Sequence, residues 1–352
     1  MNISIAIVDN NRIYLERLVE VLQEYEDLSV SIYTNSELLE KSLEVKKYDI
    51  VLFNPDICDE KIRFSNVKLP ICLYSNEEKN AALYSEYNKV IKYQRISKLY
   101  KDIIKLYADK AGDIPDFDNM QKSKMIAVYS PIGGSGKTTV ALAVASMIGA
   151  LGENVLYLNT EQLDSSSCLN AHTVDEDGIT ILLESLEENI NFELKLKGIA
   201  KKGIDGFSYI EGFERIVDYN SVSKEEAAAV LEKIIRYGNY GVVIVDMGSC
   251  LNEIGQAVFG KADRIIIVEK LGDVSMKKIE MFSKQALTLE YMDKMCKIRN
   301  FADNFANQED ALDVPVVGKI TNLGNLSLKN TIQKITSKAV INVDAVFRKN
   351  FK

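Results

Sequence analysis

The most constraining feature of the sequence is the run Ser-Pro-Ile-Gly-Gly-Ser-Gly-Lys-Thr-Thr at residues 130–139. It follows the apolar, β-type run Met125–Tyr129 and opens the Ala/Val-rich helical stretch Thr138–Leu151. A strand, a glycine loop and a helix in this order form the context that a phosphate-binding loop requires. A glycine-rich turn with a solvated lysine is the competing interpretation, but the flanking elements favour phosphate binding.

The chemistry of this loop follows from its residue types. Glycines let backbone N–H groups close around phosphate oxygens, and the helix N-terminus adds unpaired N–H groups and a positive dipole end. Lys137 is predicted to reach the β- and γ-phosphates, and the Thr138 hydroxyl to ligate Mg²⁺. The predicted nucleotide contacts are Gly133, Gly134, Ser135, Gly136, Lys137, Thr138 and Thr139.

The chain is long enough for two domains, and its pattern divides in two. Apolar β-type runs alternate with helical patterns on both sides of a polar stretch that contains Gly, Pro and Asp. We therefore predict an α/β protein with two doubly wound parallel-sheet domains. Their expected bounds are 1–110 for a flavodoxin-like domain, 111–122 for a linker and 123–352 for a P-loop NTPase domain.

The predicted strands of the first unit lie at 3–8, 28–33, 49–53, 70–74 and 89–91, with helical patterns at 11–24, 36–46, 78–87 and 96–109. In the second unit, strands are expected near 125–130, 154–158, 242–246, 264–268, 296–300 and 315–320.

Charge and cysteine usage narrow the function classes. The net charge of −8 argues against a broad basic face for non-specific DNA binding, so DNA is not an expected partner. Five scattered cysteines, no membrane-length apolar run and no basic, apolar leader indicate a reduced, cytoplasmic protein. The tail from Lys329 to Lys352 is basic, with six Lys/Arg against one acid. A solvated helix is the default interpretation, and membrane contact is expected only through this tail.

The loop resembles the deviant Walker A motif of the ParA/MinD family of ATPases, Lys-Gly-Gly-x-Gly-Lys-Thr-Thr. Every position matches except the first, where Ile132 replaces the signature lysine. The resemblance implies a dimer that sandwiches ATP, with each signature lysine contacting the partner's phosphates. Ile132 cannot supply that charge, so we expect slow hydrolysis, while its side chain could still pack against the partner subunit.

The same resemblance implies further site residues. The strand-terminal Asp246 corresponds to the Walker B acid, which would hold Mg²⁺, and the loop Met247–Ser249 would sense the γ-phosphate. Where the family has Asp-x-Asp, this chain has Asn159-Thr-Glu161, so Glu161 is the candidate for orienting water, with Asp164 close enough to compete. The expected catalytic set is Lys137, Glu161 and Asp246, with Thr138 and Asp246 as metal residues.

Base recognition has two candidates in the sequence. Asn300 follows the sixth strand, where family members often carry an asparagine that reads adenine. The alternative is the turn Thr321–Asn322. No Asn/Thr-Lys-x-Asp guanine motif occurs, so ATP with Mg²⁺ is the expected cofactor.

The first unit resembles a response-regulator receiver. Asp9, Ser75 and Lys92 stand where that family keeps an acidic Mg²⁺ ligand, a Ser or Thr, and a lysine, although Asn10 replaces a second acid. Asn54 occupies the place of the phospho-accepting aspartate, and a carboxamide cannot form an acyl phosphate. The resemblance implies a pseudo-receiver used for protein contacts. An unrelated flavodoxin-like domain remains the alternative.

This domain order resembles the TadZ/CpaE family of Flp/Tad pilus assembly proteins. The resemblance implies an ATP-dependent homodimer with weak ATPase activity, pilus-assembly partners and a polar position in the cell. A ParA-like partitioning ATPase and a signalling regulator with a receiver-like domain are the alternatives.

Overall fold

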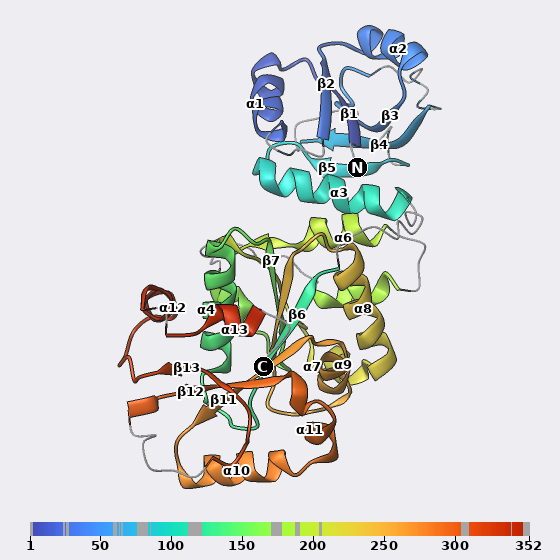
Figure 1. Cartoon of the computed structure of the whole chain (residues 1–352). Coiled ribbons are helices and arrows are strands. Elements are labelled where there is room, and N and C mark those ends of the chain that lie inside the picture. The colour runs from blue at the N-terminus through green and yellow to red at the C-terminus, as the bar shows by residue number, and fades with distance from the viewer. Residues whose placement is uncertain are drawn as a thin grey trace. The chain divides into compact units, whose positions relative to one another are not determined.

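A computed structural model of the chain gives the arrangement of its elements (Figure 1). The structure describes residues 3–23, 25, 28–58, 62, 64, 66–75, 84, 86–111, 122–169, 178–186, 191–203, 206–303, 310–338 and 340–347. His172, the expected linker at its positions 112–121, most of the helical pattern 78–87 and the end of the basic tail lie outside these residues.

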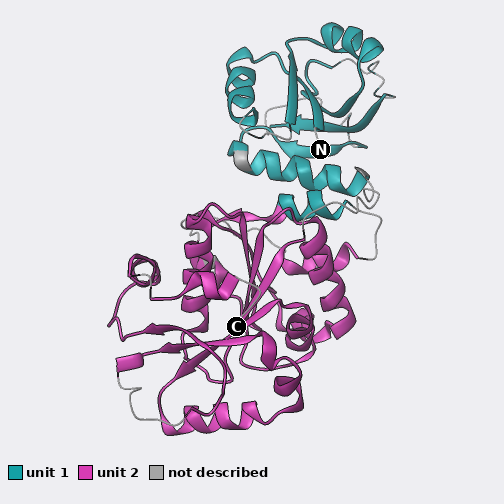
Figure 2. Cartoon of the chain, in the orientation of Figure 1, with its two compact units in different colours: residues 1–114, 189–198 teal, residues 115–188, 199–352 magenta. Residues whose placement is uncertain are grey.

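The chain forms two compact units (Figure 2). The first comprises residues 1–114 together with 189–198, and the second comprises residues 115–188 and 199–352. The chain therefore passes from one unit to the other three times. The linear division expected from the sequence does not include the segment 189–198 in the first unit.

The first unit is built on a five-stranded parallel sheet in the order β2-β1-β3-β4-β5. This is the flavodoxin-like strand order. Its elements are β1 (Ile3–Val8), α1 (Arg12–Leu22), β2 (Leu28–Tyr33), α2 (Ser36–Val45), β3 (Tyr48–Phe53), β4 (Val67–Tyr74), β5 (Asn88–Ile91) and α3 (Ile96–Ala111).

Alternating side chains of β1 explain why helices cover both faces of this sheet. Ile5 and Ile7 pack into a core with α1 and α3, whereas Ala6 and Val8 pack into a second core with α2. The period of two along a strand sends neighbouring residues to opposite faces, so an apolar run such as β1 is buried on both sides.

One helix of the first unit comes from far along the chain. Helix α6 (Phe192–Ile199) begins at Asn191, whose side chain accepts a hydrogen bond from Leu194 N and whose N–H donates to the Ala108 carbonyl of α3. Leu194 is buried in the same core as α1 and α3, and Lys195 forms an ion pair with Asp109. Helix α6 thus completes the α3 side of the first unit.

The second unit contains an eight-stranded sheet in the order β13-β12-β11-β6-β10-β7-β9-β8, in which only β8 runs antiparallel to its neighbour. Its strands are β6 (Lys124–Tyr129), β7 (Val155–Thr160), β8 (Lys201–Lys202), β9 (Ser208–Ile210), β10 (Val242–Met247), β11 (Arg264–Lys270), β12 (Met295–Asn300) and β13 (Val316–Ile320).

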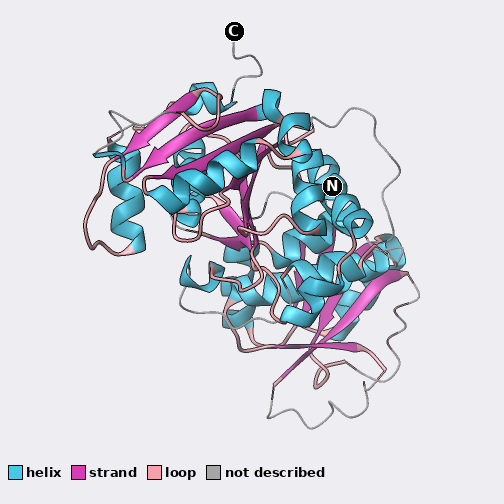
Figure 3. Ribbon diagram, turned by 90° about the horizontal axis from the view of Figure 1, so that it is seen from below, coloured by secondary structure: helices cyan, strands magenta, loops and turns pink. Residues whose placement is uncertain are grey.

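Its helices are α4 (Lys137–Ala150), η1 (Ser166–Leu169), α5 (Ile179–Glu184), α7 (Ile216–Ser221), α8 (Lys224–Tyr237), α9 (Glu253–Lys261), α10 (Asp273–Ser283), α11 (Ala286–Glu290), η3 (Met292–Lys294), α12 (Leu328–Ser337) and α13 (Val343–Phe347). Figure 3 distinguishes the strands from the helices that cover them.

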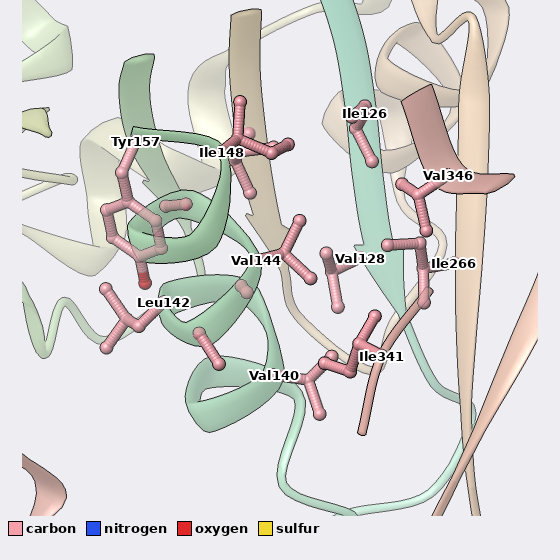
Figure 4. Packing of buried hydrophobic residues seen from close by; sticks show 14 of the residues in the cluster. Ile126, Val128, Val140, Leu142, Val144, Ile148, Tyr157, Ile266, Ile341 and Val346 are labelled. Atoms are coloured by element: carbon pink, nitrogen blue, oxygen red, sulfur yellow. The ribbon is translucent and has the colours of Figure 1, made fainter. Parts of the chain in front are cut away.

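Helix α4 is apolar all round because it is enclosed between the sheet and two later helices. Val140 and Val144 of α4 pack with Val128 of β6, and Ile341 and Val346 belong to the same cluster (Figure 4). On the opposite face, Tyr129 meets the rings of Phe259 in α9 and Phe282 in α10. This packing fixes the start of α4, and with it the preceding glycine loop.

The α/β fold class and its parallel sheets agree with the sequence prediction. The two short strands β9 and β8 at one end of the second unit's sheet were not expected, because runs of three and two residues are too short to show a periodic pattern. Among the described residues, no helix is long and apolar enough to cross a bilayer.

Candidate functional site

The glycine loop joins β6 to α4 at the centre of the second unit's sheet, at the carboxyl ends of its parallel strands. Gly134 and Gly136 adopt left-handed backbone conformations, with φ values of 64° and 87°. A Cβ atom at Gly136 would lie 2.3 Å from the Asn300 side-chain nitrogen, so glycine is required there. Gly133 and Gly134 are exposed, and no atom lies within 4 Å of where their Cβ atoms would be. The loop therefore offers an open backbone surface for a ligand.

Ile132 is buried within the chain, with 5% of its surface exposed. The Ser130 side chain holds this turn by accepting a hydrogen bond from Ile132 N at 3.2 Å. The expectation that the Ile132 side chain could pack against a partner subunit is therefore corrected, because the side chain is already enclosed.

Lys137 is the first residue of α4, and its ammonium group points to two loops that follow neighbouring strands. Its Nζ donates to the Ser249 hydroxyl at 2.9 Å and lies 3.9 Å from a carboxylate oxygen of Glu161. Ser249 follows β10, and Glu161 follows β7. One buried cation thus connects the glycine loop to both segments that the sequence analysis singled out.

Asp246 lies near the end of β10 and is completely buried. One carboxylate oxygen, Oδ2, accepts a hydrogen bond of 2.8 Å from the Tyr157 hydroxyl. The other, Oδ1, has no hydrogen-bond partner among the described residues. Burial and the charge of Glu161 raise the pKa of Asp246 to about 7, against the opposing influence of Thr138, Tyr157 and Lys137. Thr138 is thus close enough to the carboxyl group to lower its pKa.

The two acids that follow β7 have different surroundings. Burial raises the pKa of Glu161, while Lys137 opposes this rise and Asp164 adds to it. Asp164 accepts hydrogen bonds from both the backbone N–H and the hydroxyl of Ser166, at 3.0 and 2.6 Å. Asp164 therefore accepts hydrogen bonds from the first residue of η1, whereas Glu161 is the acid that lies close to Lys137.

Asn300 is hydrogen-bonded to the glycine loop. Its side-chain nitrogen donates to the Ser135 carbonyl at 2.8 Å, and its side-chain oxygen accepts from Phe301 N at 3.0 Å. Both ends of the amide are engaged, so Asn300 supports the loop in this structure, and base reading by this residue stays a prediction. The alternative segment Thr321–Asn322 is exposed, and Asn322 N donates to Asp303, two residues beyond Phe301.

Two unpartnered polar atoms mark this site as suited to a phosphate ligand with a hard cation. Within the part of the chain that the structure describes, neither the buried Ser135 hydroxyl nor Oδ1 of Asp246 has a hydrogen-bond partner. Among the described residues, no three His, Cys, Asp or Glu side chains cluster to hold a metal ion. Mg²⁺ bound with a nucleotide needs only one or two carboxylates beside the phosphates, so the donor set of Asp246 and Thr138 fits it.

Tyr157 is a site residue that the sequence analysis missed. It lies in the apolar run of β7, where a tyrosine is indistinguishable from a core residue, and only the fold shows its hydroxyl on Asp246. Burial and Asp246 raise the pKa of Tyr157 well above its ordinary value, so the hydroxyl stays a neutral donor.

The first unit holds a separate buried cluster at the carboxyl ends of its strands. Lys92 Nζ lies 2.7 Å from an Asp9 carboxylate oxygen, and the Asn54 amide donates to the same oxygen at 3.2 Å. Burial alone would lower the pKa of Lys92, but the hydrogen bond and the charge of Asp9, together with Tyr93, outweigh it, so the pKa is raised. The fold thus brings together three residues that the sequence analysis had singled out.

Comparisons with known proteins bear on the second unit. Residues 123–295 match the model of a protein family described as an AAA domain. A ParA family ATPase from Chlorobium tepidum is similar in structure, with a TM-score of 0.54 and 17% identity over 65% of this chain and 99% of that one. MinD in the MinC:MinD cell division complex of Aquifex aeolicus gives a TM-score of 0.51 and 19% identity, over 65% and 97%. No curated protein matches this chain.

The strand–loop–helix unit and its central sheet define the class of a P-loop nucleotide-binding fold. More particularly, the second unit has the fold of the ParA/MinD-type P-loop ATPases.

Proposed function

We propose that the second unit binds ATP with Mg²⁺ and works as a nucleotide-controlled, slow ATPase. The observation that carries this proposal is the meeting of Lys137, Thr138 and the half-satisfied carboxylate of Asp246 beside an open glycine loop.

Each residue has a role that follows from its position. The loop amides and Lys137 would hold the phosphates, while Thr138 and Asp246 would hold the cation, directly or through water. Bound Mg²⁺ would neutralise phosphate charge as it develops in the reaction. Because Lys137 contacts Ser249 and Glu161, a phosphate that attracts this lysine would compete with both contacts. The loops after β7 and β10 would thereby respond to the nucleotide.

The homodimer is a further part of the proposal. Two subunits would enclose ATP, as the family resemblance implies, and turnover would be slow because Ile132 supplies no cation in trans. With Ile132 enclosed in its own subunit, ATP itself and other residues at the site rim must provide the contacts between subunits. A dimer whose formation depends on ATP suits a positional marker in the cell.

At the finest level, we infer a TadZ/CpaE-like role in Flp/Tad pilus assembly or its polar localisation. The order of the units supports it, because a flavodoxin-like unit precedes an ATPase fold. A ParA-like partitioning role is the second candidate, since plasmid partition proteins have related structures. The net charge of −8 disfavours it, and salt-dependent DNA binding would be the result that favours it.

The first unit is proposed to be a pseudo-receiver that makes protein contacts. Asn54 donates to Asp9 and cannot accept a phosphoryl group, so acetyl phosphate is expected to leave the mass of the chain unchanged. A phosphate adduct on residues 1–110, lost on treatment with hydroxylamine, would overturn this proposal and revive a signalling role.

The central experiment compares Lys137→Ala with the parent chain by calorimetry and molar mass, with and without ATP. Removing the charge is expected to weaken ATP binding on the order of 100-fold and to abolish ATP-dependent dimers. Lys277→Ala, at an exposed lysine, is the matched control and should behave as the parent. In cells, Lys137→Ala is also expected to reduce surface Flp-type pili. Unchanged ATP affinity in Lys137→Ala would contradict the assignment of the site.

A further inference from the structure

Phe301 has an unusual backbone conformation immediately after β12. Its φ of 54° lies in the left-handed region, which a bulky aromatic residue rarely adopts. Among the described residues, only Asn239 shares a positive φ without being glycine. The Phe301 side chain is not enclosed, since 38% of the residue is exposed. Burial of the ring therefore does not account for the strained backbone, and such strain is often retained at ligand sites.

Phe301 is joined directly to the phosphate-binding loop. Its N–H donates to the Asn300 side chain, and Asn300 in turn donates to the Ser135 carbonyl. The position of the Phe301 backbone is therefore fixed relative to the loop that would hold the phosphates. A ligand reaching from that loop past the end of β12 would meet this residue.

A cation lies beside the Phe301 ring. Lys270, at the end of β11, is opposite Asn300 in the parallel register, and its Nζ lies 5.4 Å from the ring centroid. The interaction holds the ring and leaves a half-buried ammonium group at the rim of the site.

The segment that carries Phe301 is anchored at both of its described ends. Asp303 accepts a hydrogen bond of 2.8 Å from Asn322 N, which ties the segment to the loop after β13. Further along, Asp310 pairs with Lys297 and Arg299 of β12, and Glu269 of β11 joins the same network. Lys297 is completely buried, so its ion pair ties Asp310 to the inner strand β12.

We propose that Phe301 and Lys270 form a base shelf, on which the planar nucleobase of the bound nucleotide stacks. Lys270 would hold the ring and offer a donor to the base or ribose. Aromatic stacking accepts any base because each has a π-face, so the shelf contributes affinity and places the base more than it selects it. This inference rests on the proposed function, because it concerns the same nucleotide.

The test separates binding of the base from binding of the phosphates. Phe301→Gly removes the ring and also suits the left-handed backbone, so the variant is expected to fold. Calorimetry would compare ATP with inorganic tripolyphosphate on the parent and the variant. We expect about tenfold weaker ATP binding in Phe301→Gly, with tripolyphosphate affinity unchanged. Leu326→Gly, at an exposed apolar residue of the loop after β13, is the matched control and should bind both ligands as the parent does.

A second variant gives an optical readout. The chain contains no tryptophan, so Phe301→Trp introduces a single indole at the shelf. Its fluorescence is expected to change on addition of ATP and to stay constant on addition of tripolyphosphate. Lys270→Met, which keeps the side-chain stem without the charge, should weaken ATP binding a few-fold.

Four outcomes would overturn the shelf. Equal losses for ATP and tripolyphosphate in Phe301→Gly would mean that Phe301 acts on the phosphate loop, and unchanged affinity for both would mean that it does not touch the ligand. If the parent chain binds tripolyphosphate but not ATP, no base is accommodated. Failure of the parent to bind either ligand would overturn the proposed function and the shelf together.

Discussion

At the scale of single residues, the buried carboxylate of Asp246 depends on one tyrosine. Tyr157 donates to Oδ2, and Oδ1 has no hydrogen-bond partner among the described residues. The hydrogen bond from Tyr157 fixes the orientation of the carboxylate, because it holds Oδ2 and leaves only Oδ1 to bind a cation. Tyr157 is thus a positioning residue for the proposed Mg²⁺ site.

Tyr157→Phe is expected to weaken Mg²⁺ binding in the presence of ATP by about 10- to 100-fold, as is usual when a hydrogen bond to a metal ligand is removed. Binding of metal-free ATP should change little. The measurement is a Mg²⁺ titration at constant ATP, followed by calorimetry.

Tyr209→Phe provides the matched control for this experiment. Tyr209 is a fully buried tyrosine of β9 whose hydroxyl has no hydrogen-bond partner among the described residues, so the same atom is removed without affecting Asp246. If both variants show the same Mg²⁺ dependence, Tyr157 acts only as a core residue.

Single residues of the site could be predicted from the sequence where a motif restricts the backbone conformation. The glycine loop and Lys137 could be predicted, because their spacing between a strand and a helix allows one geometry. The surroundings of Asn300 could not be predicted, because a hydrogen bond to Ser135 joins residues 165 positions apart. The αL conformation of Phe301 likewise leaves no mark on the sequence.

At the scale of elements, we predict that helix α6 contributes to the stability of the first unit. Leu194 is 2% exposed and lies in the core of the first unit beside α1 and α3. Leu194→Ala should destabilise that unit by roughly 2–5 kcal/mol, because it removes buried methyl groups and leaves a cavity. Hydrogen exchange of the α3 amides, followed by mass spectrometry on the full chain, is the measurement.

The control is Leu38→Ala, the same substitution at a leucine of α2 that is 47% exposed. Faster exchange in α3 is expected only for Leu194→Ala. If α3 keeps the protection of the parent in both variants, α6 does not contribute to the stability of the first unit.

Helices and strands could be predicted where the apolar pattern of the sequence extends over enough residues to identify the element. The long strands of both sheets were expected from continuous apolar runs, which mark strands buried on both faces. Helix α6 was not anticipated, because its apolar residues are spread over only eight positions. Its place on α3 depends on contacts with residues about 90 positions earlier, such as that of Lys195 with Asp109.

At the scale of the whole molecule, the sequence predicted two α/β units, and two compact units are present. The predicted domain bounds divide the chain at one point, so they place the segment 189–198 in the second unit. In the structure this segment belongs to the first unit. The strand order of each sheet also required the structure, since apolar runs reveal that strands exist without revealing which of them are neighbours.

The position of helix α6 in the first unit has a consequence for how such a protein can evolve. A recombination event that replaced the first 111 codons with those of another domain would leave Leu194 and Asn191 without the surface on which they rest. An exchange of the later codons would remove a helix from the first unit. We therefore expect that neither unit can be exchanged alone without loss of stability in the first unit, and that substitutions in α3 and α6 accompany one another.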